Sequence, residues 1–367
     1  MATPPLNGTA RNFRSYLFKK PFARDALTFL ILTVATMLFM LPAIASAWMA
    51  NSDIAIVDIQ AAHMLHGEWA AFLWSNVYQG CIFPLIAAAG FAVLGPNEPF
   101  LFVMSLIAYI VMQGFLYAIL RRRLTRRLAL LLCLPTAFVS PIFALNMFYP
   151  RFVTLAIAMA SLWLADGATS ARRPLAWLAG ATTLFSFGIY VDEYILFFLP
   201  GLGILGLLAA FDPPSTPRQR LTRFIWFAIP LAAGCLVMLY VRAIAHATGT
   251  IGDATGAIRQ FNAHLLIHEC LPYLFAAKWY DQGVPRPVQP SGLVQILLWA
   301  AAAAYIGACA YGCVQAARPS TPWRTRRLAA CALAIWGFGV VAFLISHVAV
   351  DAKSCRYIAP ILFTAPF

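Results

Sequence analysis

Carboxylate and imidazole side chains gather in one short stretch, residues 51–69, directly after the first long apolar run of the chain. Asp53, Asp58 and Glu68 are three of only 13 acidic residues in 367, and His63 and His66 lie between them. A carboxylate held where lipid meets water is costly unless it serves a purpose. We therefore interpret these residues as candidates for proton transfer and substrate contact, with Asp53 as the first choice for a general base.

A structural role is the alternative for several residues of this stretch. A short interfacial helix is predicted directly after Asp53, which is a good N-cap residue. His63 and His66, three residues apart, share one face of that helix. Trp74 and Tyr78 follow, and they fit either contact with a sugar or anchoring at the depth of the lipid headgroups.

Cationic side chains in other loops are candidates for binding a phosphate. Arg151 opens an apolar helix, and Lys353, Arg356 and Tyr357 lie together near the end of the chain. A planar guanidinium binds two phosphate oxygens at once, whereas the alternative for Arg151 is contact with lipid headgroups. Together with the acidic loop, these residues predict a pocket that holds a phosphate beside a proton acceptor.

Other polar residues are weaker candidates for binding a substrate or a metal. Asp192 and Glu193 form a tight acidic turn, for which a solvated loop is the slightly favoured alternative. His264 and Lys278 lie in a second long loop, where His264 and His268 share a helical face. The cysteines show no CxxC motif. We therefore predict no certain cofactor and leave the use of a divalent metal open.

Membrane-spanning helices must position these residues. The chain is 62% hydrophobic and 11% charged, with a mean hydropathy of +0.78, which predicts an all-α polytopic membrane protein. A basic N-terminus, 1–25, precedes one transmembrane domain, 26–367, with about nine or ten spanning runs, the last cut off at Phe367. Cys81–Gly95 is apolar but shorter than the roughly 17–25 residues that span a bilayer, so we predict that it does not cross.

With that choice, the charged residues divide unequally between the two sides of the membrane. One side carries 19 Lys or Arg against three acids, and the other carries seven against ten. The positive-inside rule places the N-terminus in the cytoplasm and the loops 49–99 and 247–291 outside. The net charge of +13 is thereby explained by topology and membrane lipids, and nucleic acid is not an expected partner. Cys270 and Cys355 both fall on the outer side, where they either pair or remain buried thiols.

Several short motifs resemble the GT-C membrane glycosyltransferases, most closely the bacterial branch of the protein mannosyltransferase and lipid A aminoarabinose transferase superfamily. The matching residues are Asp53, Ala62-His63-Met64-Leu65-His66-Gly67-Glu68-Trp69, Phe72-Leu73-Trp74, Pro84-Leu85, Leu94-Gly95-Pro96, Tyr149-Pro150-Arg151 and Arg356-Tyr357-Ile358-Ala359-Pro360. The chain departs from many members within these motifs. Their paired acids, separated by one residue, are absent, because Asp53 and Asp58 lie five apart, and their Pro-Pro before the interfacial helix is reduced to Pro84.

The resemblance implies a GT-C-like helical bundle and transfer of a sugar from a polyprenyl-phosphate donor, with inversion, to a lipid, glycan or protein acceptor. It implies an active site on the outer face of a bacterial inner membrane. Asp53 would be the general base, and Arg151 with Arg356 or Lys353 would stabilise the departing lipid phosphate.

Two other classes stay open. A flippase or transporter of lipid-linked glycans would need charges within its helices, for which Arg242 is the main candidate. A surface-polysaccharide polymerase or ligase would use arginines of a late outer loop, such as Arg259 and Arg286.

Overall fold

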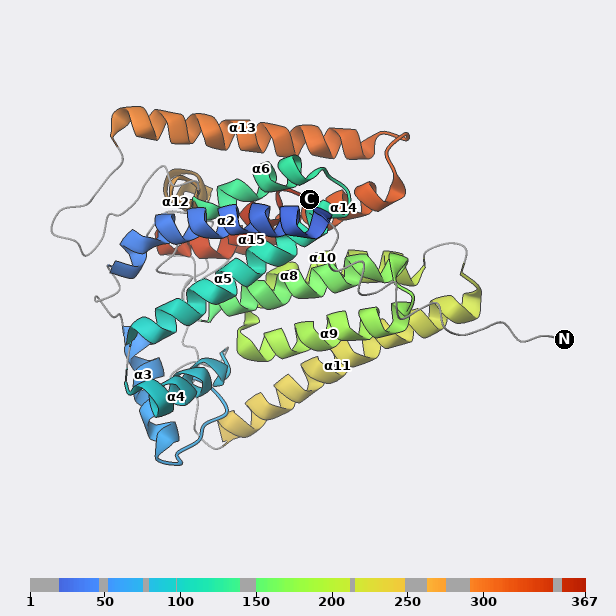
Figure 1. Cartoon of the computed structure of the whole chain (residues 1–367). Helices are drawn as coiled ribbons and strands as arrows, with labels where there is room; N and C mark the ends of the chain where they lie inside the picture. The colour runs from blue at the N-terminus through green and yellow to red at the C-terminus, as the bar shows by residue number, and fades with distance from the viewer. Residues whose placement is uncertain are drawn as a thin grey trace.

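All the regular secondary structure described in the computed structural model is helical (Figure 1). The structure describes residues 20–45, 52–74, 79–96, 98–138, 150–211, 215–247, 263–274, 291–345 and 352–367. At 20–24, 41–45, 52–54, 98–99, 246, 269, 273 and 352–354 it describes the backbone alone. The fold predicted from composition, an all-α polytopic membrane protein, is confirmed.

Seven stretches of helix within the described residues are long and apolar enough to cross a membrane. They are α5 (Glu98–Arg121), α8 (Arg151–Gly167), α9 (Pro174–Val191), η3 with α10 (Glu193–Phe198 and Leu199–Ala210), α11 (Pro217–Ala247), α13 (Gly292–Ala317) and α14 (Trp323–Leu344). Two further predicted spans correspond to α2 (Lys20–Ala45) and to the shorter described helix α6 (Arg126–Ala137). A short terminal helix, α15 (Ala359–Thr364), follows the turn η5 (Ala352–Ile358).

Helix α8 lies at the centre of the bundle and packs against α5, α9 and α10. Its residues Leu155, Met159 and Leu162 are fully buried because three neighbouring helices surround it. Helices α11 and α13 lie on opposite sides of the bundle and leave most of their apolar surface uncovered (Figure 1). Large exposed apolar side chains of this kind are suited to lipid rather than to water.

Two short helices follow the first span. Helix α3 (Ser52–Leu65) packs against α4 (Ile82–Leu94), which has 13 residues. At 1.5 Å per residue α4 is about 20 Å long, well under the roughly 30 Å hydrocarbon core. This agrees with the expectation that Cys81–Gly95 does not cross the membrane.

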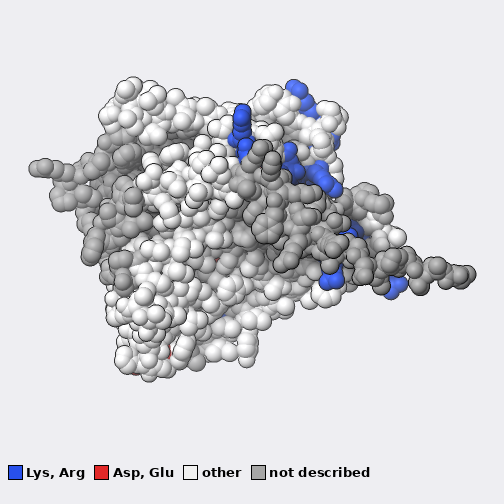
Figure 2. Space-filling model, in the orientation of Figure 1, with Lys and Arg blue, Asp and Glu red and all other residues white. Residues whose placement is uncertain are grey.

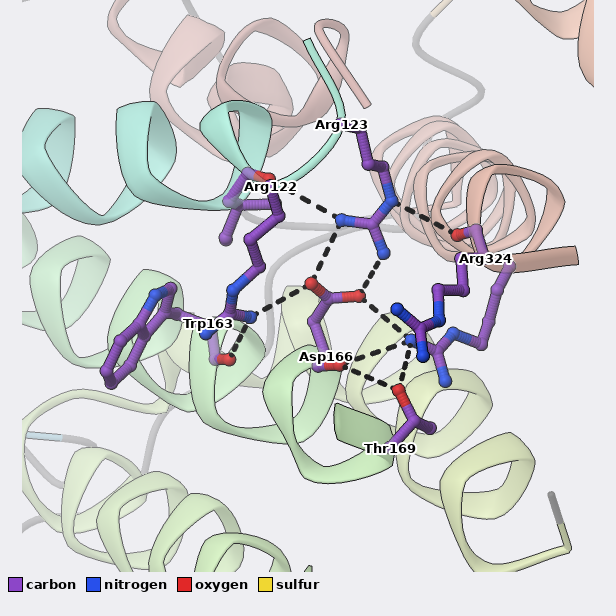
Figure 3. Close-up of polar contacts among 8 residues, drawn as sticks. Arg122, Arg123, Trp163, Asp166, Thr169 and Arg324 are labelled. Carbon is purple, nitrogen blue, oxygen red and sulfur yellow. Dashed lines mark hydrogen bonds and ion pairs between the residues drawn. The ribbon is translucent and has the colours of Figure 1, made fainter. Parts of the chain in front are cut away.

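The basic residues visible in Figure 2 gather at one end of the bundle, which we call the basic end. There Asp166 of α8 is surrounded by three arginines (Figure 3). Arg123 Nη2 lies 2.5 Å and Arg327 Nη2 3.2 Å from Asp166 Oδ1, and Arg122 Nη1 lies 3.0 Å from Oδ2. Arg327 also donates to Thr169 Oγ1 at 3.0 Å. The cluster joins the end of α5, the end of α8 and the start of α14.

Candidate functional site

A buried carboxylate, Asp192, marks the end of the bundle opposite the basic end. Helix α9 ends at Val191, and Asp192 adopts an extended conformation before η3. Its Oδ1 accepts a hydrogen bond from the Tyr194 backbone N–H at 2.8 Å, so Asp192 is the N-cap of the next helix. Capping accounts for the partner of Oδ1, whereas Oδ2 has other partners.

The second oxygen of Asp192 faces two side chains from distant parts of the sequence. Gln79 Nε2 donates to Oδ2 at 3.1 Å, and Arg151 Nε lies 4.0 Å from the same atom. The side chains of Arg151 and Asp192 are 9% and 3% exposed. The two alternatives considered from the sequence are therefore wrong: Asp192 is not in a solvated turn, and Arg151 points into the protein rather than to lipid headgroups.

The electrostatics of Asp192 are dominated by its burial. Burial raises the pKa of Asp192 above its usual range because the charged form loses its hydration. Arg151, the Tyr194 N–H, Gln79 and, more weakly, Arg356 lower the pKa again without reversing the rise. The carboxylate is thus held in a dry site by partners that favour its charged form.

Arg356 and Tyr357 of η5 lie at the same end. Tyr194 Oη donates to the Arg356 carbonyl at 2.6 Å, which fixes η5 against η3. The Arg356 guanidinium lies 4.9 Å from the centre of the Tyr357 ring and donates to its hydroxyl at 3.1 Å. The structure therefore brings Arg151, Arg356 and Tyr357, from segments 200 residues apart, to the surroundings of Asp192 and Tyr194.

Glu193, the second acid of the turn, has a different partner. Its carboxylate forms an ion pair with Arg242 of α11. Arg242 was the charge within a helix that a transporter path would need, and here it neutralises Glu193.

The stretch of candidate acids after the first span is anchored by a buried amide. Gln60 of α3 is fully buried, donates to the Phe72 carbonyl at 2.9 Å and accepts from the Trp74 N–H at 3.0 Å. The chain then returns, and the Gly80 N–H donates to the Tyr190 carbonyl at 2.8 Å. A side chain at position 80 would clash with that carbonyl oxygen, so the approach requires glycine. This path carries Gln79 to Asp192.

Other candidates of the first loop lie on a more open surface. His63 Nδ1 lies 2.6 Å from Glu68 Oε2. The centroids of the His63 and Trp74 rings are 5.0 Å apart. The His63 and Glu68 side chains are 44% and 64% exposed, so this pair contributes little to stability. Asp58, also on α3, is half-buried.

The remaining polar candidates and cysteines have local contacts or are buried. His66 Nδ1 hydrogen-bonds to the Ala62 carbonyl at 2.8 Å. The rings of His264 and His268, on the second long loop, lie 4.5 Å apart. Cys270 and Cys355 are buried, free thiols. Within the part of the chain that the structure describes, no group of three or more His, Cys, Asp or Glu could hold a metal ion.

Four predicted site residues lie outside the described side chains: Asp53, Tyr78, Lys278 and Lys353. For Asp53 the backbone is described. Helix α3 begins at Ser52, so Asp53 lies in its first turn rather than just before the helix. The expected position for an N-cap is therefore shifted by a residue or two, which is within the usual variation of helix ends.

Sequence reasoning missed Gln60 and Gln79, the two buried amides that connect the first loop to Asp192. Uncharged amides in an apolar sequence carry no recognisable motif. The one available signal was the Gln79-Gly80 pair, because a glycine inside an apolar segment often marks a close approach of two backbones.

The fold and this end of the bundle define a polytopic helical membrane protein with two arginines near a buried carboxylate. Residues 79–244, under half of the chain, match the family model described as dolichyl-phosphate-mannose-protein mannosyltransferase. The match supports the resemblance to the GT-C superfamily of membrane glycosyltransferases. The matched region includes Gln79, Arg151 and Asp192, and begins after Asp53 and Asp58. No curated protein and no solved structure gives a match.

Proposed function

We propose that the chain transfers a sugar from a polyprenyl-phosphate donor to a lipid, glycan or protein acceptor, at the end of the bundle opposite the basic end. The observation that carries this proposal is Arg151, buried beside Asp192 and near Arg356, within the region that matches a family using dolichyl-phosphate mannose. By the positive-inside rule this end faces the outer side of a bacterial inner membrane.

The chemistry assigned to each residue follows from charge. The acceptor oxygen attacks the anomeric carbon from the face opposite the phosphate while its proton passes to a carboxylate, for which Asp53 remains our first choice and Asp58 and Glu68 the others. The bond between the anomeric carbon and the phosphate oxygen breaks, and the configuration inverts. Arg151, with Arg356 or Lys353, stabilises the charge that the leaving phosphate gains.

Asp192 is assigned a positioning role rather than that of the base. Its Oδ1 caps η3, and its Oδ2 faces Gln79 and Arg151. A carboxylate so occupied holds the guanidinium in place. The other polar candidates, His63, His66, Trp74, Tyr78, Glu193, His264, Lys278 and Tyr357, remain assigned to substrate contact.

The test is transfer by the purified protein from a labelled polyprenyl-phosphate sugar to a lipid acceptor. We expect release of polyprenyl phosphate and label on the acceptor. Asp53→Asn should abolish transfer, and Arg151→Gln should lower kcat by about 10²–10³-fold, the usual loss for one group that stabilises a developing anion. Arg127→Gln, an exposed change at the basic end, is the control.

Each competing class gives a different product. Donor movement across the bilayer without release of polyprenyl phosphate would identify a flippase and refute the proposal. Repeated lengthening of one glycan would identify a polymerase. Full turnover by Asp53→Asn would remove the assigned base while leaving the transferase assignment in place.

A further inference from the structure

A basic cavity of about 560 Å³ lies at the basic end, between the start of α9 and the start of α11. Arg172 and Arg173 lie on one wall, and Arg218 and Arg223 lie on the other. Helices α9 and α11 pack side by side, so the two walls are held together by the body of the bundle.

The cavity concentrates positive charge. The described acids at this end, Asp166 and Asp25, form ion pairs with other arginines, namely Arg122, Arg123 and Arg327 for Asp166 and Arg121 for Asp25. Within the described residues no ion pair involves the four arginines of the cavity. The N-termini of α9 and α11 add the positive ends of two helix dipoles. An anion in the cavity would relieve the repulsion among these charges.

Exposed apolar side chains lie along α11, next in sequence to the residues that line the cavity. Leu221, Ile225 and Ile229, four residues apart and therefore on one face, are 60%, 40% and 60% exposed. Trp226 beside them is 50% exposed, and exposed Trp residues are common where a helix meets the lipid headgroups. A ligand suited to both surfaces has a phosphate at one end and hydrocarbon chains at the other.

We propose that this cavity is a binding site for the phosphate headgroup of an anionic phospholipid, whose acyl chains lie along the exposed face of α11. Each guanidinium binds a phosphate through two parallel hydrogen bonds, and a wall of two arginines suits one phosphate. Two such walls favour a lipid with two phosphates, of the cardiolipin class, over a lipid with one. Basic pockets between helices on the cytoplasmic side are known to hold such headgroups. The site is separate from the proposed transferase site.

The test compares two double variants that lose the same charge from the same end of the molecule. Arg173→Gln with Arg218→Gln removes one arginine from each wall, and Arg127→Gln with Arg318→Gln removes two exposed arginines elsewhere. Delipidated protein in neutral detergent is titrated with cardiolipin, phosphatidylglycerol or phosphatidylcholine, and binding is followed by native mass spectrometry. We expect the cavity variant to bind cardiolipin at least tenfold more weakly than the wild type, and the control variant to bind within about twofold.

Additional measurements keep the proposal falsifiable if the cavity variant is unstable. Arg173→Lys with Arg218→Lys keeps the charge and should retain most of the binding while losing preference for two phosphates. Cardiolipin should raise the thermal midpoint of the wild type and the control variant equally. Equal weakening in the cavity and control variants would show a diffuse surface attraction and overturn the proposal. Displacement of the lipid by inorganic pyrophosphate at equal concentration would overturn the assignment of a lipid ligand.

Discussion

The pairing of Arg151 with Asp192 predicts an asymmetric response to removing either partner. Asp192→Ala leaves a buried guanidinium that cannot lose its proton, which costs about 3–5 kcal/mol, and removes the N-cap of η3, which costs about 1 kcal/mol. Arg151→Met leaves a carboxylate that can become neutral, because burial already raises the pKa of Asp192. We therefore expect about 4–6 kcal/mol of destabilisation for Asp192→Ala and about 1–3 kcal/mol for Arg151→Met.

The double variant separates this pairing from general damage to the site. If the loss in Asp192→Ala comes from breaking this ion pair, removing Arg151 as well should recover about 2–3 kcal/mol relative to the sum of the single variants. The assay is equilibrium unfolding in detergent micelles, followed by far-ultraviolet circular dichroism. Additive effects of the two substitutions would refute the reasoning.

A matched control for this cycle lies at the basic end. Arg121 Nε lies 3.0 Å from Asp25 Oδ1, and the two side chains are 31% and 32% exposed. Because solvent screens this pair, its coupling energy should be no more than about 1 kcal/mol. A coupling at Arg151 and Asp192 as small as that of the control would show that burial does not make the site special.

Three further predictions concern charge and backbone contact. Between the ordinary pKa of 3.8 and the raised pKa of folded Asp192, this residue binds more protons in the folded than in the unfolded state, so its contribution to stability should fall as pH rises through that window. Asp192→Asn should flatten the pH dependence of the thermal midpoint, and an unchanged profile would contradict the raised pKa. Gly80→Ala should destabilise the fold by its clash with the Tyr190 carbonyl, whereas Gly203→Ala, in α10 with open space around it, should be neutral or stabilising; equal midpoints would contradict the close approach. Asp166→Asn should cost about 3–5 kcal/mol in chemical unfolding because the buried Arg327 loses its counter-ion, and a cost below 1 kcal/mol would show that the cluster is solvated.

The helices of the bundle were predictable because each depends on the residues of its own segment of the sequence. Long runs of apolar residues predict membrane-spanning helices. The apolar stretch that forms α4 is too short to cross a bilayer, in agreement with the thirteen residues of that helix. Charge sorting by side also placed Arg151 and Arg356 at one end, where the structure has both near Asp192. None of these inferences required knowing which helix packs against which.

The burial of Asp192 was not predictable, because it depends on a contact between segments 113 residues apart. An acidic pair between two apolar runs is indistinguishable in sequence from a solvated turn. Only the return of the first loop at Gly80, against the Tyr190 carbonyl, covers the turn and brings Gln79 to it. Apart from Gly80 itself, no local sequence pattern indicates that these two segments approach each other.

Asp166 and Asp192, the two buried carboxylates among the described residues, differ in how fully arginine engages them. Both oxygens of Asp166 accept direct hydrogen bonds from guanidinium groups, at 2.5–3.2 Å, so that cluster joins three helices as a structural unit. At the other end, Asp192 accepts from Gln79 and from a backbone N–H, while Arg151 Nε stands 4.0 Å away, beyond hydrogen-bonding distance. An arginine attracted in this way is oriented without a bidentate lock on its carboxylate. This contrast, together with the family match over residues 79–244, is why we propose substrate chemistry for the Asp192 end and a structural role for Asp166.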